Sequence, residues 1–299
     1  MSAACVIEIA NLRKSYGSVE AVRGLSLQVP AGSIYGVLGR NGAGKTTTIK
    51  MLLGMTRPTS GLVRVFGMGA DDPSSSVEIR RRTGFVSEDK DLYDSMTIGG
   101  IIRFTAALCP RWRTDLEDRY RRTFDLPLDK KVKGLSRGTR TKLALLLALC
   151  RGADLLVLDE PTSGLDPVVT EEVLQALVSH VASDEMTVFF STHQIAEVDQ
   201  IADRVAIIDR GRLAVAGALD DLRQNFRRIQ FVFDGAAPEP SFRAPGVRRV
   251  QRAGRVLTVL CDAGADEILD EARPLGAVAV DVLPVTLKEI FLETVSSED

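Results

Sequence analysis

The most informative segment of this chain is rich in glycine and reads Gly39-Arg40-Asn41-Gly42-Ala43-Gly44-Lys45-Thr46, followed by Thr47. It comes after a short apolar run at residues 33–38, which predicts a buried strand, and before residues 47–53, which predict a helix that ends near Gly54. A strand, a loop that ends in Gly-Lys-Thr and a helix form the context that a phosphate-binding loop requires. The sequence therefore predicts that this chain binds a nucleoside triphosphate.

The residue types in this loop suit a triphosphate. Glycines let the backbone turn tightly and direct its N–H groups at phosphate oxygens. The N-terminus of the following helix adds a partial positive charge, Lys45 can reach the β- and γ-phosphates, and the Thr46 hydroxyl can ligate Mg²⁺. The alternative is a glycine-rich turn with an incidental lysine. It is disfavoured because the Gly-Lys-Thr end and both flanking elements are complete.

A second apolar run, residues 154–158, ends in two acidic residues, Asp159 and Glu160. In a P-loop nucleotide hydrolase, an aspartate at the tip of such a strand holds Mg²⁺ and a glutamate points toward the γ-phosphate. Two adjacent acids after a strand can also be mere surface charge. The presence of a phosphate loop in the same chain favours the catalytic interpretation.

The chain contains only two histidines, His180 and His193. His193 follows a third buried run, residues 187–192, at the point where a parallel strand brings a side chain to the nucleotide edge of the sheet. We therefore predict that His193 contacts the γ-phosphate. His180 is expected on a solvated helix face.

Composition limits the class of partner. The 299 residues leave room for one large domain, or for one large and one small domain. The 38 basic and 40 acidic residues give a net charge of −2, which predicts no nucleic-acid partner. The charge is uneven, because residues 80–142 hold 16 basic and 9 acidic residues. This excess fits a solvated basic face, which is favoured, or a surface for acidic headgroups or an acidic partner.

The cysteines and the apolar runs bear on the compartment. Cys5, Cys109, Cys150 and Cys261 show no metal-binding spacing and fit a reducing compartment, with Cys150 expected in the core. Residues 1–4 lack the regions of a signal peptide, and no run of about 18 apolar residues predicts a membrane span. We expect a protein of the cytosol, or one that another protein holds at a membrane.

The remaining pattern predicts two domains. Residues 97–149 are helical with breaks at 109–112 and 126–127, which predicts a helical subdomain at about 92–150. Residues 204–209 and 211–215 predict a terminal hairpin. From residue 226 the pattern changes to alternating strands at 229–233, 256–260 and 277–283, a helix at 265–273, and a last helix that opens with a capping box at residues 286–289. We therefore predict a domain at 1–225 and a small α+β domain at 226–299.

In this order, the elements resemble the ATP-binding subunit of an ABC transporter over roughly residues 5–220. The most diagnostic match is to the family's signature sequence, Leu135-Ser136-Arg137-Gly138-Thr139. Residues 163–166, which end in Asp166, match the loop between the two active sites, and Tyr16 matches the aromatic residue that stacks on adenine. The resemblance implies an α/β P-loop NTPase cassette with a mixed sheet core, an antiparallel β subdomain and a helical subdomain.

The resemblance also implies the chemistry and the partners. ATP and Mg²⁺ are the expected cofactors, and hydrolysis is expected to use Glu160 to polarise water, with His193 and Lys45 on the γ-phosphate. Two subunits would enclose two ATP molecules, each phosphate loop facing the signature of the other subunit. A separate integral membrane permease would hold the dimer at the cytoplasmic face of the cell membrane. Mg²⁺ would be held by Thr46, Asp159 and Glu88. The residues expected to bind nucleotide are Tyr16, Gly39, Arg40, Asn41, Gly42, Ala43, Gly44, Lys45, Thr46, Thr47, Glu88, Ser136, Gly138 and Asp166.

Two departures from the family pattern carry predictions. Glu88 stands where the family usually has glutamine, and its added negative charge predicts weaker or more Mg²⁺-dependent ATP binding. Arg137 and Thr139 replace glycine and glutamine in the signature. Ser136 and Gly138 remain, so the contact across the dimer is expected to persist.

The subtype also follows by resemblance. The turn at residues 109–112, the variant at residues 88–90 and the short α+β tail resemble export-type systems of bacteria, including drug and antibiotic exporters. A soluble ABC-type ATPase that acts on a ribosome or DNA is the alternative. It is disfavoured because the chain has no long coiled coil, second cassette or zinc-binding cysteines. A regulatory subunit that does not hydrolyse ATP is disfavoured because Glu160 and His193 are present.

Overall fold

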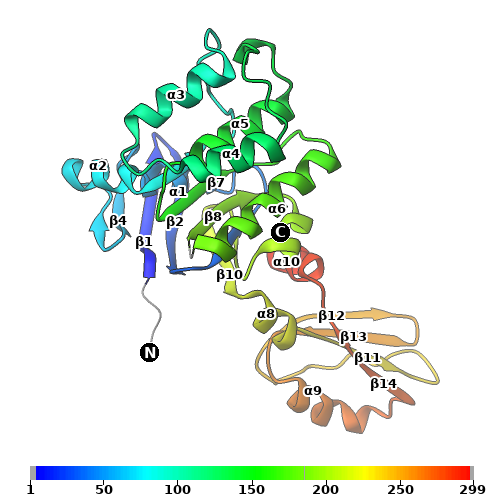
Figure 1. Ribbon diagram of the computed structural model, residues 1–299. Helices are drawn as coiled ribbons and strands as arrows, with labels where there is room; N and C mark the ends of the chain where they lie inside the picture. The colour runs from blue at the N-terminus through cyan, green and yellow to red at the C-terminus, as the bar shows by residue number, and fades with distance from the viewer. Residues whose placement is uncertain (1–4, 185, 297–299) are drawn as a thin grey trace. The chain divides into compact units, whose positions relative to one another are not determined.

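The computed structural model describes residues 5–184 and 186–296 (Figure 1). It divides into two compact units, the first ending at Ala216 and the second beginning at Gly217. The sequence placed this division after residue 225. The observed division comes earlier because helix α8 (Leu219–Asn225) leads directly into the second unit, where the Arg223 carbonyl accepts a hydrogen bond from Arg227.

The first unit is built on a six-stranded sheet in the order β10-β9-β3-β8-β7-β6. The strands β9, β3, β8, β7 and β6 pair in parallel. Every residue of β3, β7 and β8 is buried, as expected for strands covered on both faces. The carboxyl ends of these three neighbouring strands therefore meet at one edge. The bounds are β3 (Ile34–Leu38), β6 (Thr83–Val86), β7 (Leu155–Asp159), β8 (Thr187–Thr192), β9 (Arg204–Asp209) and β10 (Arg212–Ala218).

A second, antiparallel sheet in the first unit has the order β2-β1-β4-β5, with bounds β1 (Cys5–Tyr16), β2 (Val19–Pro30), β4 (Ser60–Val65) and β5 (Met68–Gly69). β1 continues to Tyr16, which pairs with Val19. The hairpin turns within two residues at Gly17, whose φ of 59° is in the left-handed region. The mixed core and the antiparallel sheet confirm the expected fold class.

The helices of the first unit are α1 (Lys45–Leu52), α2 (Pro73–Arg81), α3 (Ile98–Leu108), α4 (Thr114–Thr123), α5 (Arg137–Leu149), α6 (Pro167–Asp184) and α7 (Ile195–Ile201), with a 3₁₀ turn at Val132–Gly134. The helices α3, α4 and α5 gather into the expected helical part (Figure 1). Asp72 caps α2 by accepting a hydrogen bond from Ser75 N at 2.8 Å. None of the described helices is long and apolar enough to cross a bilayer.

His180 lies in the core, so the prediction of a solvated helix face was wrong. Only 3% of the residue is exposed, and its Nδ1 lies 3.2 Å from the hydroxyl of Tyr120. Tyr120 belongs to α4 and is itself buried, which shows that α4 covers this face of α6. Cys150 is buried as predicted, and burial raises the pKa of its thiol.

The second unit contains a four-stranded sheet in the order β12-β13-β11-β14. One face buries Ile229, Phe231, Leu257 and Val259, together with Ile268 of α9. The sequence did not predict β12, because most of its residues are exposed and show no apolar alternation. The last helix opens with the predicted capping box, since Thr286 N donates to Glu289 Oε2 at 2.9 Å. The bounds are β11 (Arg227–Val232), β12 (Val247–Ala253), β13 (Val256–Cys261), β14 (Ala279–Pro284), α9 (Ala265–Ala272) and α10 (Leu287–Ser296).

Candidate nucleotide site

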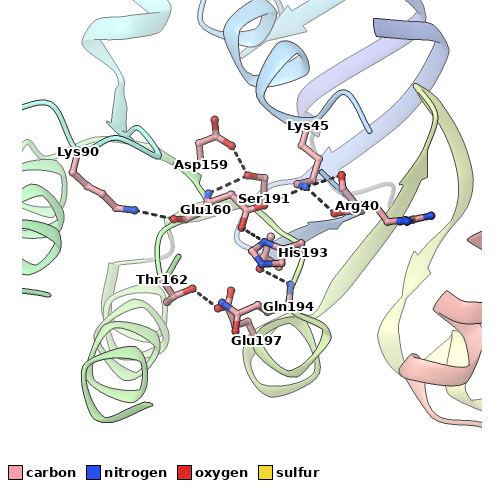
Figure 2. A network of polar contacts seen from close by, with 12 residues as sticks. Arg40, Lys45, Lys90, Asp159, Glu160, Thr162, Ser191, His193, Gln194 and Glu197 are labelled. Carbon is pink, nitrogen blue, oxygen red and sulfur yellow. Dashed lines mark hydrogen bonds and ion pairs between the residues drawn. The ribbon is translucent and has the colours of Figure 1, made fainter. Parts of the chain in front are cut away.

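The predicted phosphate loop, acidic pair and histidine come together at the carboxyl edge of the central sheet. The phosphate loop follows β3, Glu160 follows β7 and His193 follows β8. Because β3, β8 and β7 are neighbours and run in parallel, their ends deliver these side chains to one place. Figure 2 shows Lys45, Glu160 and His193 pointing toward one another.

The phosphate loop has the backbone that an anion site needs. Gly42 and Gly44 have φ values of 83° and 99°, which side chains rarely allow. A Cβ at Gly39 would lie 2.4 Å from the Ile208 carbonyl oxygen, so this position also requires glycine. Helix α1 begins at Lys45 without a side-chain cap and with no acidic residue in its first turn. The loop and the helix N-terminus therefore fit the phosphates of a nucleotide.

The Glu160 carboxylate lies between two basic groups. Its Oε2 is 2.8 Å from His193 Nδ1, and its Oε1 is 3.1 Å from Lys45 Nζ, close enough for an ion pair but not aligned as a hydrogen bond. Lys45 Nζ also donates to the carbonyl oxygens of Gly39 and Arg40 at 2.7 and 3.2 Å. Glu160 and Lys45 are both buried, so each compensates the charge of the other.

The backbone of Glu160 is held as firmly as its side chain. Its φ of 48° is unusual for a residue other than glycine. Its N–H lies 3.2 Å from the carbonyl oxygen and 3.1 Å from the Oγ of Ser191, and that Oγ donates to Asp159 Oδ1 at 2.6 Å. Its carbonyl oxygen accepts from Lys90 Nζ at 2.9 Å. Sequence reasoning missed the parts played by Ser191 and Lys90; the one available signal was a cation in the loop after β6.

A buried carboxyl group, Glu197, lies behind this centre and was also missed. It belongs to α7, and its Oε1 accepts a hydrogen bond from the Thr162 hydroxyl. No hydrogen-bond partner reaches its Oε2 among the described residues. Burial raises the pKa of Glu197, while the neighbouring side chains of Thr162 and Thr192 oppose that shift. No motif marks this residue in the sequence.

Two predicted residues lie at the surface. Tyr16 is half exposed, and Lys14 Nζ lies over its ring, 4.9 Å from the ring centroid. Glu88 is exposed and lines a cavity of about 260 Å³ with Lys90, Arg137 and other residues. Among the residues that the structure describes, no group of three or more His, Cys, Asp or Glu side chains is placed to hold a metal ion. A hydroxyl from Thr46 and a carboxylate from Asp159 are oxygen ligands of the kind Mg²⁺ takes, and such sites are commonly completed by phosphate oxygens.

The predicted signature residues serve local structure within this chain. Ser136 caps α5, its Oγ accepting from Thr139 N at 3.2 Å. A Cβ at Gly138 would lie 3.3 Å from Val169, so α5 packs tightly on α6 here. Asp166 caps α6 by accepting from the N–H groups of Val168 and Val169 at 3.1 Å. Within the part of the chain that the structure describes, Ser136, Gly138 and Asp166 form no hydrogen bond with the phosphate loop.

Comparisons with known proteins identify the family. A family model described as ABC transporter matches residues 22–163. The chain is 36% identical over 225 residues to the bacitracin transport ATP-binding protein BcrA of Bacillus licheniformis, covering 75% of this chain and 73% of that protein. It is 31% identical over 310 residues to the Nod factor export ATP-binding protein I of Ralstonia nicotianae, covering 98% and 94%. A solved ATP binding subunit of an ABC transporter superimposes with a TM-score of 0.66 at 27% identity, covering 73% of this chain and 92% of that one. The chain belongs to the family of ABC transporter ATP-binding subunits, which hydrolyse ATP.

Proposed function

We propose that this chain hydrolyses Mg²⁺-ATP at the edge formed by β3, β7 and β8, and that hydrolysis drives export through a separate membrane permease. The observation that carries the proposal is the placement of Glu160. Its carboxylate is buried between Lys45 and His193, next to a loop whose backbone fits phosphates. A carboxylate so placed can accept a proton from water that attacks the γ-phosphate.

The other residues have distinct roles in this proposal. The N–H groups of residues 39–47 bind the phosphates, and Lys45 exchanges its contacts with loop carbonyls and Glu160 for the β- and γ-phosphates. Thr46, Asp159 and Glu88 would hold Mg²⁺, which supplies charge neutralisation when bound. His193 orients the Glu160 carboxylate through Nδ1 and contacts the γ-phosphate. Tyr16 stacks on the adenine ring.

A second copy of the chain completes the site in this proposal. The N-terminus of α5 carries the Ser136 cap and no acidic residue in its first turn, which suits an anion. The hydrogen bonds of Ser136 within the described chain do not involve the phosphate loop, so the anion would come from another subunit. In a twofold dimer that encloses two ATP molecules, each ATP would contact the phosphate loop of one subunit and the N-terminus of α5 of the other. ATP would then hold the dimer together, and hydrolysis would release it.

The membrane partner and the direction of transport rest on the relatives. Bacitracin transport and Nod factor export stand in the names of proteins that this chain resembles over most of its length. The permease would hold the chain at the cytoplasmic face of the membrane. An ABC-type ATPase that acts on a ribosome or DNA is the competing function. The net charge of −2 gives it no support.

A partner capture tests the proposal. Tagged Glu160→Gln, trapped with ATP and Mg²⁺ in detergent-solubilised membranes of the native host, is expected to retain a multi-spanning membrane protein in stoichiometric amount. Lys45→Ala is the matched control, because it should bind no ATP and capture less of the dimeric complex. Recovery of only ribosomal or DNA-bound partners would overturn the transporter assignment.

A further inference from the structure

Lys90 is a buried lysine to which the proposed function assigns no role. It sits in the loop after β6, and only 7% of the residue is exposed. Its N–H donates to the Ser87 carbonyl oxygen at 3.2 Å, which closes a tight turn, and its φ is 49°. Lysine is rarely buried in proteins unless its charge has partners. The local structure therefore places this ammonium group inside the protein by specific contacts.

The contacts of Lys90 lead to the catalytic edge. Its Nζ donates to the carbonyl oxygen of Glu160 at 2.9 Å, and Figure 2 shows the side chain reaching that carbonyl from the neighbouring loop. The same oxygen lies 3.3 Å from the N–H of Ser163. Burial lowers the pKa of Lys90, and four nearby carboxylates oppose this shift, those of Glu88, Glu160, Asp159 and Asp89. The ammonium group thus lies among the acidic residues assigned to Mg²⁺ and to hydrolysis.

The backbone of Glu160 explains why this contact matters. A left-handed φ of 48° at a residue other than glycine persists only where the surroundings fix it. With this backbone, the carbonyl faces Lys90 while the carboxylate faces Lys45 and His193. Without the hydrogen bond from Lys90, the N–H of Ser163 would be the remaining donor to this carbonyl, so the peptide after Glu160 could rotate more freely and the carboxylate would lose part of its direction.

We propose that Lys90 is a positioning residue for ATP hydrolysis, which holds the Glu160 carbonyl and balances the negative charge of Glu88 beside it. The inference rests on the proposed function, because it requires Glu160 to act on the attacking water. It also accounts for a departure from the family pattern: a glutamate in place of glutamine is accompanied two residues later by a buried cation.

The first test compares Lys90→Met with Lys90→Arg, and uses Lys131→Met, an exposed lysine, as the control. Because small misplacement of a catalytic group is costly, we expect Lys90→Met to lower kcat at least about tenfold with a smaller change in KM for ATP. Lys90→Arg keeps a charged donor and should recover most of the rate. Wild-type kcat in Lys90→Met would overturn the inference. If Lys90→Met does not fold, Lys90→Gln is read in the same way.

A second readout needs no nucleotide. Hydrogen exchange of the segment 158–165 should be faster in nucleotide-free Lys90→Met than in the wild type and the Lys131→Met control. Unchanged exchange there would count against the holding role. In the Glu160→Gln background, Lys90→Met should lower the residual rate no further, because both changes act through one group. Separate, additive losses would contradict a positioning role.

The design separates this inference from the proposed function. If Glu160→Gln keeps its hydrolysis, the proposed role of Glu160 fails and the inference fails with it. If Glu160→Gln is inactive while Lys90→Met behaves as the wild type, only the inference fails. If Lys90 balances the charge of Glu88, the double variant Lys90→Met/Glu88→Gln should bind ATP more tightly than Lys90→Met alone. An equal ATP affinity in the two would show that Lys90 does not balance this charge.

Discussion

His193 Nδ1 lies 2.8 Å from Oε2 of Glu160, although the two residues follow different strands of the central sheet. The other oxygen of the same carboxylate is 3.1 Å from Lys45 Nζ. The carboxylate therefore links the histidine after β8 to the lysine of the phosphate loop. In the proposed function Lys45 would leave this pair for the phosphates, which would couple nucleotide binding to the environment of the Glu160 carboxylate.

The first prediction concerns the charge of Glu160. Glu160→Gln preserves the shape of the side chain but removes the proton acceptor. We expect phosphate release to fall at least about 100-fold, in the range typical of a lost general base. Equilibrium binding of labelled ATP should persist, because the loop and Lys45 remain. Glu239→Gln, an exposed substitution in the second unit, is the control. A variant that retains a large part of the wild-type rate would contradict the role of Glu160.

The centre of the site could be predicted because each part lies next to a strand end. The apolar runs before Gly39, Glu160 and His193 are short, and every residue of the resulting strands is buried. Parallel pairing of such strands brings their ends together without knowledge of any side-chain contact. The motifs and the apolar pattern thus contain the information that the core of the site needs.

The residues that the sequence did not reveal depend on packing between distant segments. Lys90 and Glu160 are far apart in the chain, and their contact exists because the turn after β6 lies beside the end of β7. Glu197 is one polar residue of a short helix, and its burial follows from α7 packing near Thr162. His180 was misplaced for the same reason, since only its contact with Tyr120 of α4 shows that its face is covered.

The second prediction concerns the loop backbone. In Gly39→Ala the new Cβ would lie 2.4 Å from the Ile208 carbonyl oxygen and 3.1 Å from the Ala43 Cβ, so the loop must shift. Overpacking of this kind costs about 1–3 kcal/mol, and we expect ATP affinity to fall at least about tenfold. Gly235→Ala is the matched control, because a Cβ there has no neighbour within 4 Å. Equal ATP affinities for the two variants, measured by titration, would argue against a rigid loop.

The third prediction concerns Glu88 and Mg²⁺. Glu88→Gln removes a negative charge from the turn that also holds Lys90. Because the added negative charge of Glu88 is expected to make ATP binding more dependent on Mg²⁺, Glu88→Gln should reach half-maximal ATPase activity at a lower Mg²⁺ concentration than the wild type. Asp89→Asn, a neutralisation of the exposed neighbour, is the control and should have a smaller effect. An unchanged Mg²⁺ dependence of the ATPase activity in Glu88→Gln would show that the charge of Glu88 does not weaken ATP binding.

The fourth prediction concerns the capping box of the second unit. Thr286 and Glu289 satisfy backbone groups at the start of α10, with Thr286 N donating to Glu289 Oε2 at 2.9 Å and Glu289 N donating to Thr286 Oγ1 at 3.3 Å. Thr286→Ala should destabilise this helix by about 1 kcal/mol, as other lost caps do. Hydrogen exchange across residues 287–296 measures the change. Thr294→Ala serves as the control, because its hydroxyl donates to a carbonyl within the helix. Equal protection in both variants would show that the box contributes no stability.

The last prediction concerns Glu197 and pH. Burial raises the pKa of Glu197 in the folded chain above its ordinary value of 4.5. As the pH rises from 4.5, the unfolded chain loses this proton first, so the folded state binds more protons and the contribution of Glu197 to stability decreases until the folded pKa is passed. Glu197→Gln cannot ionise at this position. The stability of the wild type relative to Glu197→Gln should therefore be greatest at acid pH and should decrease as the pH rises.

This difference isolates Glu197, because the charges that face it, Glu160 and His193, are present in both proteins. Denaturant unfolding between pH 5 and 9, followed by the fluorescence of the single tryptophan, Trp112, measures the first unit. Glu171→Gln, which neutralises an exposed carboxylate on α6, is the control. The pKa of Glu171 is lowered by hydrogen bonds from Gln200 and Gln175, so its contribution to stability changes only at more acid pH, and the profile of Glu171→Gln should stay parallel to that of the wild type between pH 5 and 9. Stability profiles for the wild type and Glu197→Gln that stay parallel across this range would mean that the carboxyl group keeps its ordinary pKa despite its burial beside Thr162.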